Sequence, residues 1–173
     1  MITQPLSISN TAWTQVNMDF IKGLSHSGGV DIILVVVDKL TKYAHFTGLK
    51  HPYITVTVAH VYIYQVFKLY GLLAFIVTDW DLVFTSIFWQ ELFKIQGINL
   101  QLFTAYHPQI DGQSEVINMC LEIYLRCVAG DQPTTWFRWL SLAEWWYNST
   151  YHITIHTTPF KALYGYSPPS HLP

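Results

Sequence analysis

The chain has 173 residues, of which 51% are apolar, and this composition excludes an intrinsically disordered protein and supports a well-buried core. Only 12% of the residues are charged, and the net charge is −2, which is a weak electrostatic footprint for a protein that binds nucleic acid. Since the longest apolar runs are far shorter than the ~18 residues of a membrane-spanning helix, we expect no contact with a membrane.

The first part of the chain predicts three strands in succession. Between residues 13 and 20, apolar and polar side chains alternate with a period of two. The glycine- and serine-rich segment 23–29 predicts a hairpin turn. Residues 31–38 enclose six consecutive apolar residues, which is typical of a strand covered on both faces. Residues 44–49 predict a third strand.

Two helices and two further strands are predicted to alternate after this hairpin. Apolar residues recur at helical spacing in the first helix, at Val58, Tyr62, Val66 and Leu69. Gly71 ends this helix, and residues 72–77 and 98–104 predict the fourth and fifth strands. Ser86 is the expected cap of the helix between them, which ends at Gly97. The side chains expected to point inward from that helix are Phe88, Leu92 and Ile95.

Two helices are predicted to complete the chain. The first covers about residues 113–128, and its apolar stripe is Val116, Cys120, Ile123 and Cys127. The second covers about residues 134–148, with one apolar side formed by Trp136, Leu140, Ala143 and Tyr147. The complete order predicts an α/β fold with a mixed five-stranded sheet flanked by helices.

The two cysteines are predicted to be buried core thiols. They stand seven positions apart on one predicted helix, so their Cα atoms lie ~10 Å apart. A disulfide between them is excluded because it requires less than ~7 Å. Free thiols fit a reducing, intracellular compartment.

The placement of three carboxylates is informative, since Asp79 lies at the edge where an open α/β sheet gathers its ligands. Asp79 ends an apolar strand, Asp19 lies in the first strand, and Glu115 lies in the first turns of the long helix, with 35 residues between Asp79 and Glu115. Each also has an ordinary structural interpretation: Asp19 can face water, Asp79 can belong to an acidic turn, and Glu115 can interact favourably with the helix macrodipole. Taken together, the three can instead converge on two Mg²⁺ or Mn²⁺ ions about 3.5–4 Å apart, which activate a water or hydroxyl for attack on a phosphate.

Several longer strings are specific enough to indicate a family. They are MDFIKGL (18–24), ILVVVDKLTKYAHF (33–46), IVTDWDLVF (76–84), TAYHPQIDGQSEVIN (104–118) and TTPFKALYGYSPP (157–169). With these strings the chain resembles, over about residues 11–169, the integrase catalytic core of gypsy-type LTR retrotransposons, which is encoded within a pol polyprotein.

The resemblance implies a ribonuclease-H-like fold in which Asp19, Asp79 and Glu115 are the catalytic residues and the ligands of two Mg²⁺ (or Mn²⁺) ions. The implied reaction is phosphoryl transfer on DNA: water cuts near the 3′ ends of the element, and each freed 3′-hydroxyl then attacks target DNA. A homo-oligomer acting on DNA in the nucleus is implied as well. We expect residues 1–173 to form a single core domain, without the zinc domain and C-terminal domain of full-length integrases.

Four further residues are candidates for contacts with DNA: Gln113, Asn118, Lys42 and His107. Each has an ordinary alternative, such as capping for the polar side chains or simple solvation for the lysine. Two positions that are often basic in the family are not basic here, because Trp80 follows Asp79 and Met119 follows Asn118. A lost cation at either position removes a phosphate contact and weakens binding to DNA.

Three functions therefore remain open at the level of sequence. The first is an integrase core that processes and joins DNA ends, either intact or as a fragment or decayed copy. The second is a catalytically inactive, integrase-derived interaction module, which the high aromatic content and the scarcity of basic residues favour. The third is a ribonuclease-H-type nuclease acting on RNA–DNA hybrids, which the acidic pattern alone permits.

Overall fold

The computed structural model describes residues 10–96 and 113–170. The strands are β1 (Gln15–Ile21), β2 (Ile32–Asp38), β3 (Ala44–Leu49) and β4 (Phe75–Val77). The α-helices are α1 (Thr55–Tyr62), α2 (Lys68–Tyr70), α3 (Leu82–Gln96), α4 (Gln113–Ala129), α5 (Leu140–Ser149) and α6 (Pro159–Tyr164). A π-helical segment, η1 (Ile63–Phe67), joins α1 to α2, and two 3₁₀ segments, η3 (Pro133–Trp139) and η4 (Ile153–Ile155), flank α5. Within these ranges, no helix is both long and apolar enough to cross a lipid bilayer.

The four described strands form one mixed sheet in the order β3-β2-β1-β4. β1 and β2 are an antiparallel hairpin, in which Val16 pairs with Asp38 and Ile21 with Ile33, and β3 continues the antiparallel pattern at the edge. β4 pairs with β1 in parallel. The predicted mixed α/β architecture is thus confirmed for these four strands, and the fifth predicted strand, at residues 98–104, lies outside the described residues.

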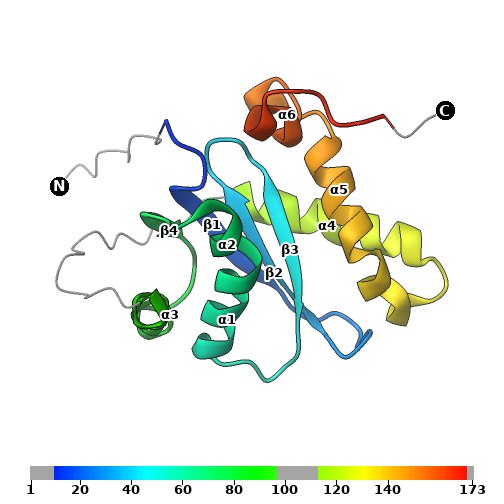
Figure 1. Cartoon of the computed structure of the whole chain (residues 1–173). Helices are drawn as coiled ribbons and strands as arrows, with labels where there is room; N and C mark the ends of the chain where they lie inside the picture. The colour runs from blue at the N-terminus through cyan, green and yellow to red at the C-terminus, as the bar shows by residue number, and fades with distance from the viewer. Residues whose placement is uncertain (1–9, 97–112, 171–173) are drawn as a thin grey trace, which may run out of the picture.

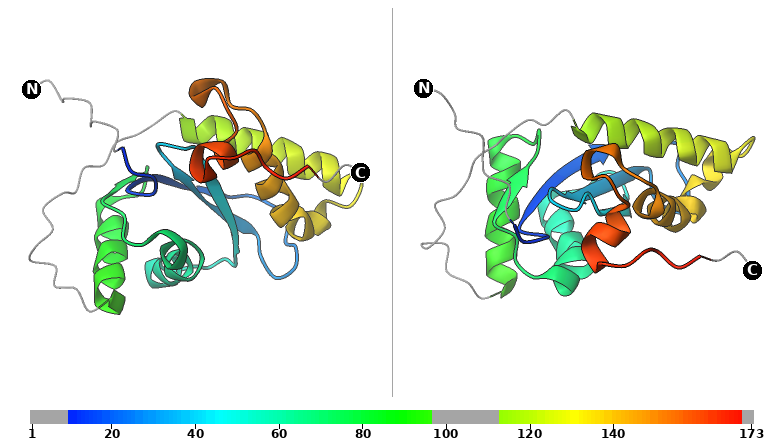
Figure 2. Two further views of the ribbon diagram at one scale, coloured as in Figure 1. Left: turned by 45° about the horizontal axis from the view of Figure 1, so that its top comes forward. Right: turned by 90° about the horizontal axis from the view of Figure 1, so that it is seen from above.

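Helices cover both faces of the sheet (Figures 1 and 2). Every residue of β2 is buried, as its unbroken apolar run predicts. Leu34 and Val36 belong to the core that α1 and α3 cover, while Ile33 and Val35 belong to the core beneath α4 and α5. The alternation of side chains along a strand therefore divides the interior into two cores.

The helices after β3 depart from their predictions in two details. Val58, Tyr62 and Val66 are buried as predicted, but Leu69 is 56% exposed, because the π-helical turn η1 shifts the helical periodicity before this residue. α3 begins at Leu82 and not at Ser86, since an Asp81 side-chain oxygen already accepts the Phe84 N–H at 2.8 Å. Its last predicted core residue, Ile95, is exposed.

The long helix α4 packs with a different stripe from the predicted one. The side chains that enter the core are Ile117, Leu121 and Leu125. Ile123 and Cys127 are exposed and Cys120 is half-buried, so the prediction of two buried thiols is wrong. The reason is that α4 carries two apolar faces, and the sheet takes the one with the larger aliphatic side chains.

The helix predicted at 134–148 is a 3₁₀ segment, η3, followed by α5. All four residues predicted for its buried side are buried, namely Trp136, Leu140, Ala143 and Tyr147. α5 lies along the edge strand β3 and completes the second helical layer (Figure 1).

Candidate functional site

Two of the three predicted acids lie just beyond the point where the parallel pairing of β1 with β4 ends. The last pair of residues in the β1–β4 ladder is Asn17 and Val77. Asp19 and Asp79 each lie two residues further along the chain, so the register brings them to the same level. Both line one pocket of about 350 Å³. Ligands of α/β sheets gather at such an edge.

The start of α4 is held against this edge by a hydrogen bond to Asp19. The Asn118 side-chain N–H donates to Asp19 Oδ2 at 2.7 Å, and the Phe20 backbone N–H donates to Asp19 Oδ1 at 2.7 Å. The Asn118 Oδ1 atom is buried and has no hydrogen-bond partner among the described residues. Asn118 was predicted to contact DNA, and in the structure its side chain is hydrogen-bonded to the carboxylate of Asp19, a candidate catalytic residue.

The electrostatics of the pocket favour a cation. Burial raises the pKa of Asp19 above its ordinary 3.8, and the nearby charge of Asp79 adds to this increase. The two hydrogen bonds to the carboxylate and the charge of Lys22 act in the opposite direction but do not cancel it. Three carboxylates line the pocket, from Asp19, Asp79 and Asp81, against the single ammonium group of Lys22.

Glu115, the third predicted acid, lies in the first turn of α4, and the structure describes its backbone but not its side chain. It precedes Asn118 by three residues, and residues at this spacing share one face of a helix. The backbone of α4 therefore places Glu115 on the face whose Asn118 contacts Asp19. Gln113 begins the same helix, and its side chain is likewise outside the description.

The other two predicted residues are not brought to this pocket within the described ranges. Lys42 lies in the turn after β2, next to Asp38, whose partner in β1 is Val16, and so it lies toward the opposite end of β1 from Asp19. His107 lies outside the described residues. Conversely, the prediction missed Lys22, which lines the acidic pocket, although it follows Asp19 by three residues in the MDFIKGL string.

The residues present fit a divalent cation bound by hard oxygen ligands. Two carboxylates, from Asp19 and Asp79, open into one pocket, and hard carboxylate oxygens are the ligands that Mg²⁺ and Mn²⁺ prefer. A bound cation would also offset the unfavourable burial of the Asp19 charge. Among the described side chains, which do not include that of Glu115, no group of three His, Cys, Asp or Glu residues forms a metal site.

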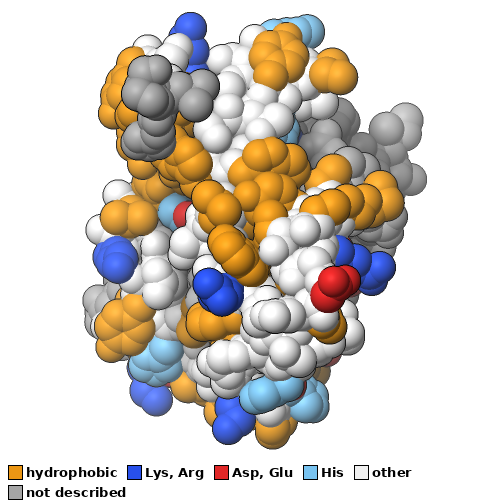
Figure 3. Space-filling model, turned by 90° about the vertical axis from the view of Figure 1, so that its right-hand side faces the viewer, with side chains coloured by type: hydrophobic (Ala, Val, Ile, Leu, Met, Phe, Trp, Pro, Cys, Tyr) orange, Lys and Arg blue, Asp and Glu red, His pale blue; other side chains and the backbone are white. Residues whose placement is uncertain are grey.

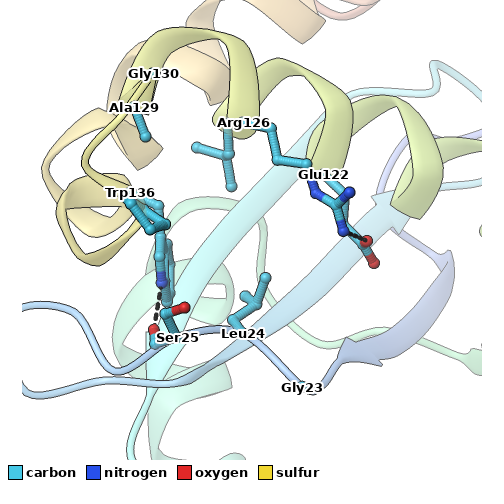
Figure 4. A pocket seen from close by; sticks show the side chains of 10 residues that line it. Gly23, Leu24, Ser25, Glu122, Arg126, Ala129, Gly130 and Trp136 are labelled. Atoms are coloured by element: carbon cyan, nitrogen blue, oxygen red, sulfur yellow. Dashed lines mark hydrogen bonds and ion pairs between the residues drawn. The ribbon is translucent and has the colours of Figure 1, made fainter.

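A second pocket lies between the hairpin turn and the end of α4 (Figure 4). Its volume is about 160 Å³. The Trp136 indole N–H donates to the Ser25 carbonyl at 2.6 Å, and Arg126 lies 4.0 Å from Glu122. These groups satisfy one another, and neither Asp19 nor Asp79 reaches this pocket, so we assign the chemistry to the acidic pocket.

The comparisons with known proteins agree with this geometry. The chain is 33% identical over 165 residues, or 95% of its length, to the Transposon Tf2-3 polyprotein of Schizosaccharomyces pombe, and equally to the Tf2-4 polyprotein. It spans about 12% of the length of these polyproteins. No protein-family model matches the chain.

Two solved structures have the same fold at low sequence identity. The integrase catalytic core domain of HTLV-2, in complex with magnesium and in a trimeric form, superposes with a TM-score of 0.64 and 17% identity over 87% of this chain and 95% of that one. A chain of the simian T-cell lymphotropic virus intasome, in complex with PP2A regulatory subunit B56 gamma, gives a TM-score of 0.70 and 16% identity over 98% of this chain and 59% of that one.

The fold is therefore that of an integrase catalytic core. The sequence match adds the particular relationship: the chain aligns with a segment of the transposon Tf2 polyproteins, which confirms the resemblance drawn from its motifs.

Proposed function

We propose that the chain is the catalytic core of a retrotransposon integrase, which processes the 3′ ends of the element's DNA and joins them to target DNA. The observation that carries this proposal is the parallel pairing of β1 and β4, which presents Asp19 and Asp79 to one pocket beside the start of α4. The likeness to Tf2 polyproteins and to retroviral integrase cores supports it.

In this proposal Asp19, Asp79 and Glu115 hold two Mg²⁺ or Mn²⁺ ions. When bound, such ions supply Lewis-acid activation of a water or a 3′-hydroxyl and stabilise charge on the phosphate. Asn118 is a positioning residue, because its N–H fixes the orientation of the Asp19 carboxylate. Among the described residues that line the pocket, Lys22 supplies the single ammonium group, and in this proposal it contacts a DNA phosphate.

Self-association and location complete the proposal. Hydrophobic side chains form a band across the face of the molecule that carries α5 and α6, with Lys and Arg side chains around it (Figure 3). The exposed members on these two helices include Leu142 and Tyr164. We propose that a second copy of the chain covers this face and that the assembly acts on DNA in the nucleus. Sedimentation of the purified chain as a strict monomer would contradict the first part.

The test of activity uses the purified full chain, DNA that carries the element's terminal sequence, and Mg²⁺ or Mn²⁺. We expect shortened and joined products, which Asp79→Asn reduces to background because one metal ligand is lost. Asp131→Asn is the matched control, since Asp131 is exposed in the turn after α4 and loses the same charge far from the pocket.

Products no more abundant than those of Asp79→Asn would overturn the proposal of an active enzyme. That result would leave the chain as an inactive, integrase-derived interaction module, for which the apolar face in Figure 3 is the favourable observation. Faster degradation of an RNA–DNA hybrid than joining of DNA would instead indicate a ribonuclease-H-type nuclease.

A further inference from the structure

The pocket that holds the two acids has an aromatic wall. Four of its eight lining residues are aromatic, and they are Phe20, Tyr53, Trp80 and Phe84. All four are half-buried, so they are neither sealed in the core nor free in solvent. Coordination of metal ions does not require such a wall beside the carboxylates.

The rings of this wall are held in place by one another. The Phe20 ring lies between its neighbours, with its centre 5.3 Å from Trp80 at an interplanar angle of 20° and 4.8 Å from Tyr53. Trp80 also packs against the fully buried Phe88 at 5.4 Å. Because the buried side of the wall is packed, its accessible surface is available to a ligand without rearrangement.

The wall continues from the acids into a neighbouring pocket of about 530 Å³. Tyr53, Phe84 and Lys22 line both pockets. The Lys22 Nζ atom lies 5.9 Å from the centre of the Phe20 ring, so a cation stands beside the aromatic surface. The two neighbouring pockets together form one groove. A ligand that extends along this groove would first meet the carboxylates of Asp19 and Asp79, which suit a metal-bound phosphate. It would then meet flat apolar rings and the ammonium group of Lys22, which suits another phosphate.

We propose that this aromatic wall receives an unpaired nucleobase of the DNA strand whose phosphate lies at Asp19 and Asp79. The inference rests on the proposed function. A nucleotide strand alternates anionic phosphates and flat bases, which matches the alternation of groups along the groove. Since a paired base inside a duplex has both faces covered by its neighbours, the wall selects an unpaired base, whose face is free to stack.

The test measures binding of two DNA probes to the full chain in Ca²⁺, a cation that accepts oxygen ligands in flexible geometry and replaces Mg²⁺ during the measurement. One probe is a duplex with a paired end, and the other has a short unpaired 3′ extension that carries the fluorescent base 2-aminopurine. We expect the extended probe to bind more tightly and its emission to fall on binding, because stacking on an aromatic ring quenches this base.

Tyr53→Leu keeps an apolar side chain but removes the ring, and we expect it to lower the preference for the extended probe about fivefold or more. Tyr53→Phe retains the ring and should retain the preference. The matched control is Tyr64→Leu, because Tyr64 is 65% exposed on η1 and lines neither pocket. Circular dichroism of each variant verifies folding, and the comparison of the two probes on the unmodified chain keeps the test valid if the Leu variant does not fold.

Equal binding of the two probes by the unmodified chain would overturn the inference, as would an unchanged preference in folded Tyr53→Leu. These results are separable from those on the proposed function. Joining of DNA ends without a ring-dependent preference overturns only the aromatic subsite. A ring-dependent preference in a chain that joins no DNA leaves the subsite standing and overturns the enzymatic proposal.

Discussion

Asp19 has a proposed catalytic role, and its ionised carboxylate is unfavourable for the stability of the folded chain. Burial and the neighbouring Asp79 raise its pKa, which means that the folded chain holds the ionised carboxylate less favourably than the unfolded chain does. The hydrogen bonds from Phe20 and Asn118 fix the carboxylate in this position. A site arranged in this way is stabilised by the cation it binds, and its unfavourable charge is greatest when no metal is present.

We therefore predict that Asp19→Asn stabilises the metal-free protein at neutral pH. Because the folded-state pKa of Asp19 is raised, the contribution of this group to stability is fully present below 3.8 and is lost as pH rises through the folded-state value. The nearly isosteric Asn variant lacks this loss. Its Oδ1 can accept the Phe20 N–H, and its own side-chain N–H can donate to Asn118 Oδ1 once the Asn118 amide is rotated. Urea unfolding in EDTA over a pH series measures the difference.

Magnesium provides the converse measurement for the same pair of proteins. A ligand that binds only the folded state stabilises it in proportion to its occupancy, so Mg²⁺ should raise the free energy of unfolding of the unmodified chain and have less effect on Asp19→Asn. A variant that is less stable than the unmodified chain at neutral pH, or that gains equally from Mg²⁺, would contradict this account of the site.

At the scale of elements, α5 closes the exposed edge of the sheet. β3 is an edge strand, whose outer backbone groups would otherwise be open to pairing with another chain. Asn148 is fully buried and forms two hydrogen bonds with Ala44: the Ala44 N–H donates to its Oδ1 at 2.8 Å, and its own N–H donates to the Ala44 carbonyl at 2.8 Å. Glu144, one turn earlier, accepts the Phe46 N–H at 2.8 Å.

Replacing Asn148 with Ala should lower the free energy of unfolding by about 3 kcal/mol, since two backbone groups of Ala44 would be buried without a partner at about 1–3 kcal/mol each. Hydrogen exchange of the Ala44 amide should accelerate as well. Ser141→Ala is the matched control on the exposed side of α5 and should change stability by less than about 0.5 kcal/mol. Equal stability of the two variants would show that the edge does not depend on Asn148.

The elements also show how far the sequence can be interpreted. The unbroken apolar run of β2 predicts burial on both faces, because the side chains on each face of the strand are apolar and are stabilised by removal from water. α4 is different, since Cys127 and Leu125 both lie on regular apolar stripes, and the helix alone cannot indicate which stripe meets the sheet. Packing against the sheet and the contact from Asn118 to Asp19 select the orientation, and these are tertiary interactions.

The sequence likewise predicts one part of the candidate site and not the other. The positions of Asp19 within the first strand and of Asp79 at the end of another strand can be predicted from the sequence, because the strands follow from local patterns of apolar residues. The aromatic wall is not visible, since Tyr53 and Phe84 lie in separate segments and their proximity to Phe20 depends on how α1 and α3 pack on one face of the sheet.

For the molecule as a whole, charge is the property that opposes the proposed function. The chain has nine Lys and Arg residues and a net charge of −2, whereas affinity for DNA grows with the number of phosphates that cations neutralise. Met119 follows Asn118 on α4 and is 57% exposed, so a longer cationic side chain would be accommodated there without disturbing the core. This position lies one turn after Glu115, on the part of α4 that approaches the acids.

Met119→Arg should therefore tighten binding to duplex DNA and make the dependence of log K on log salt steeper by about one unit, because one more phosphate loses its counterion on binding. Fluorescence anisotropy over a series of salt concentrations measures both quantities. Leu69→Arg adds the same charge at an exposed position on α2, which does not line the acidic pocket, and should change the salt dependence less. If the two variants steepen it equally, the added charge acts through the net charge of the molecule, and α4 does not lie along the bound DNA.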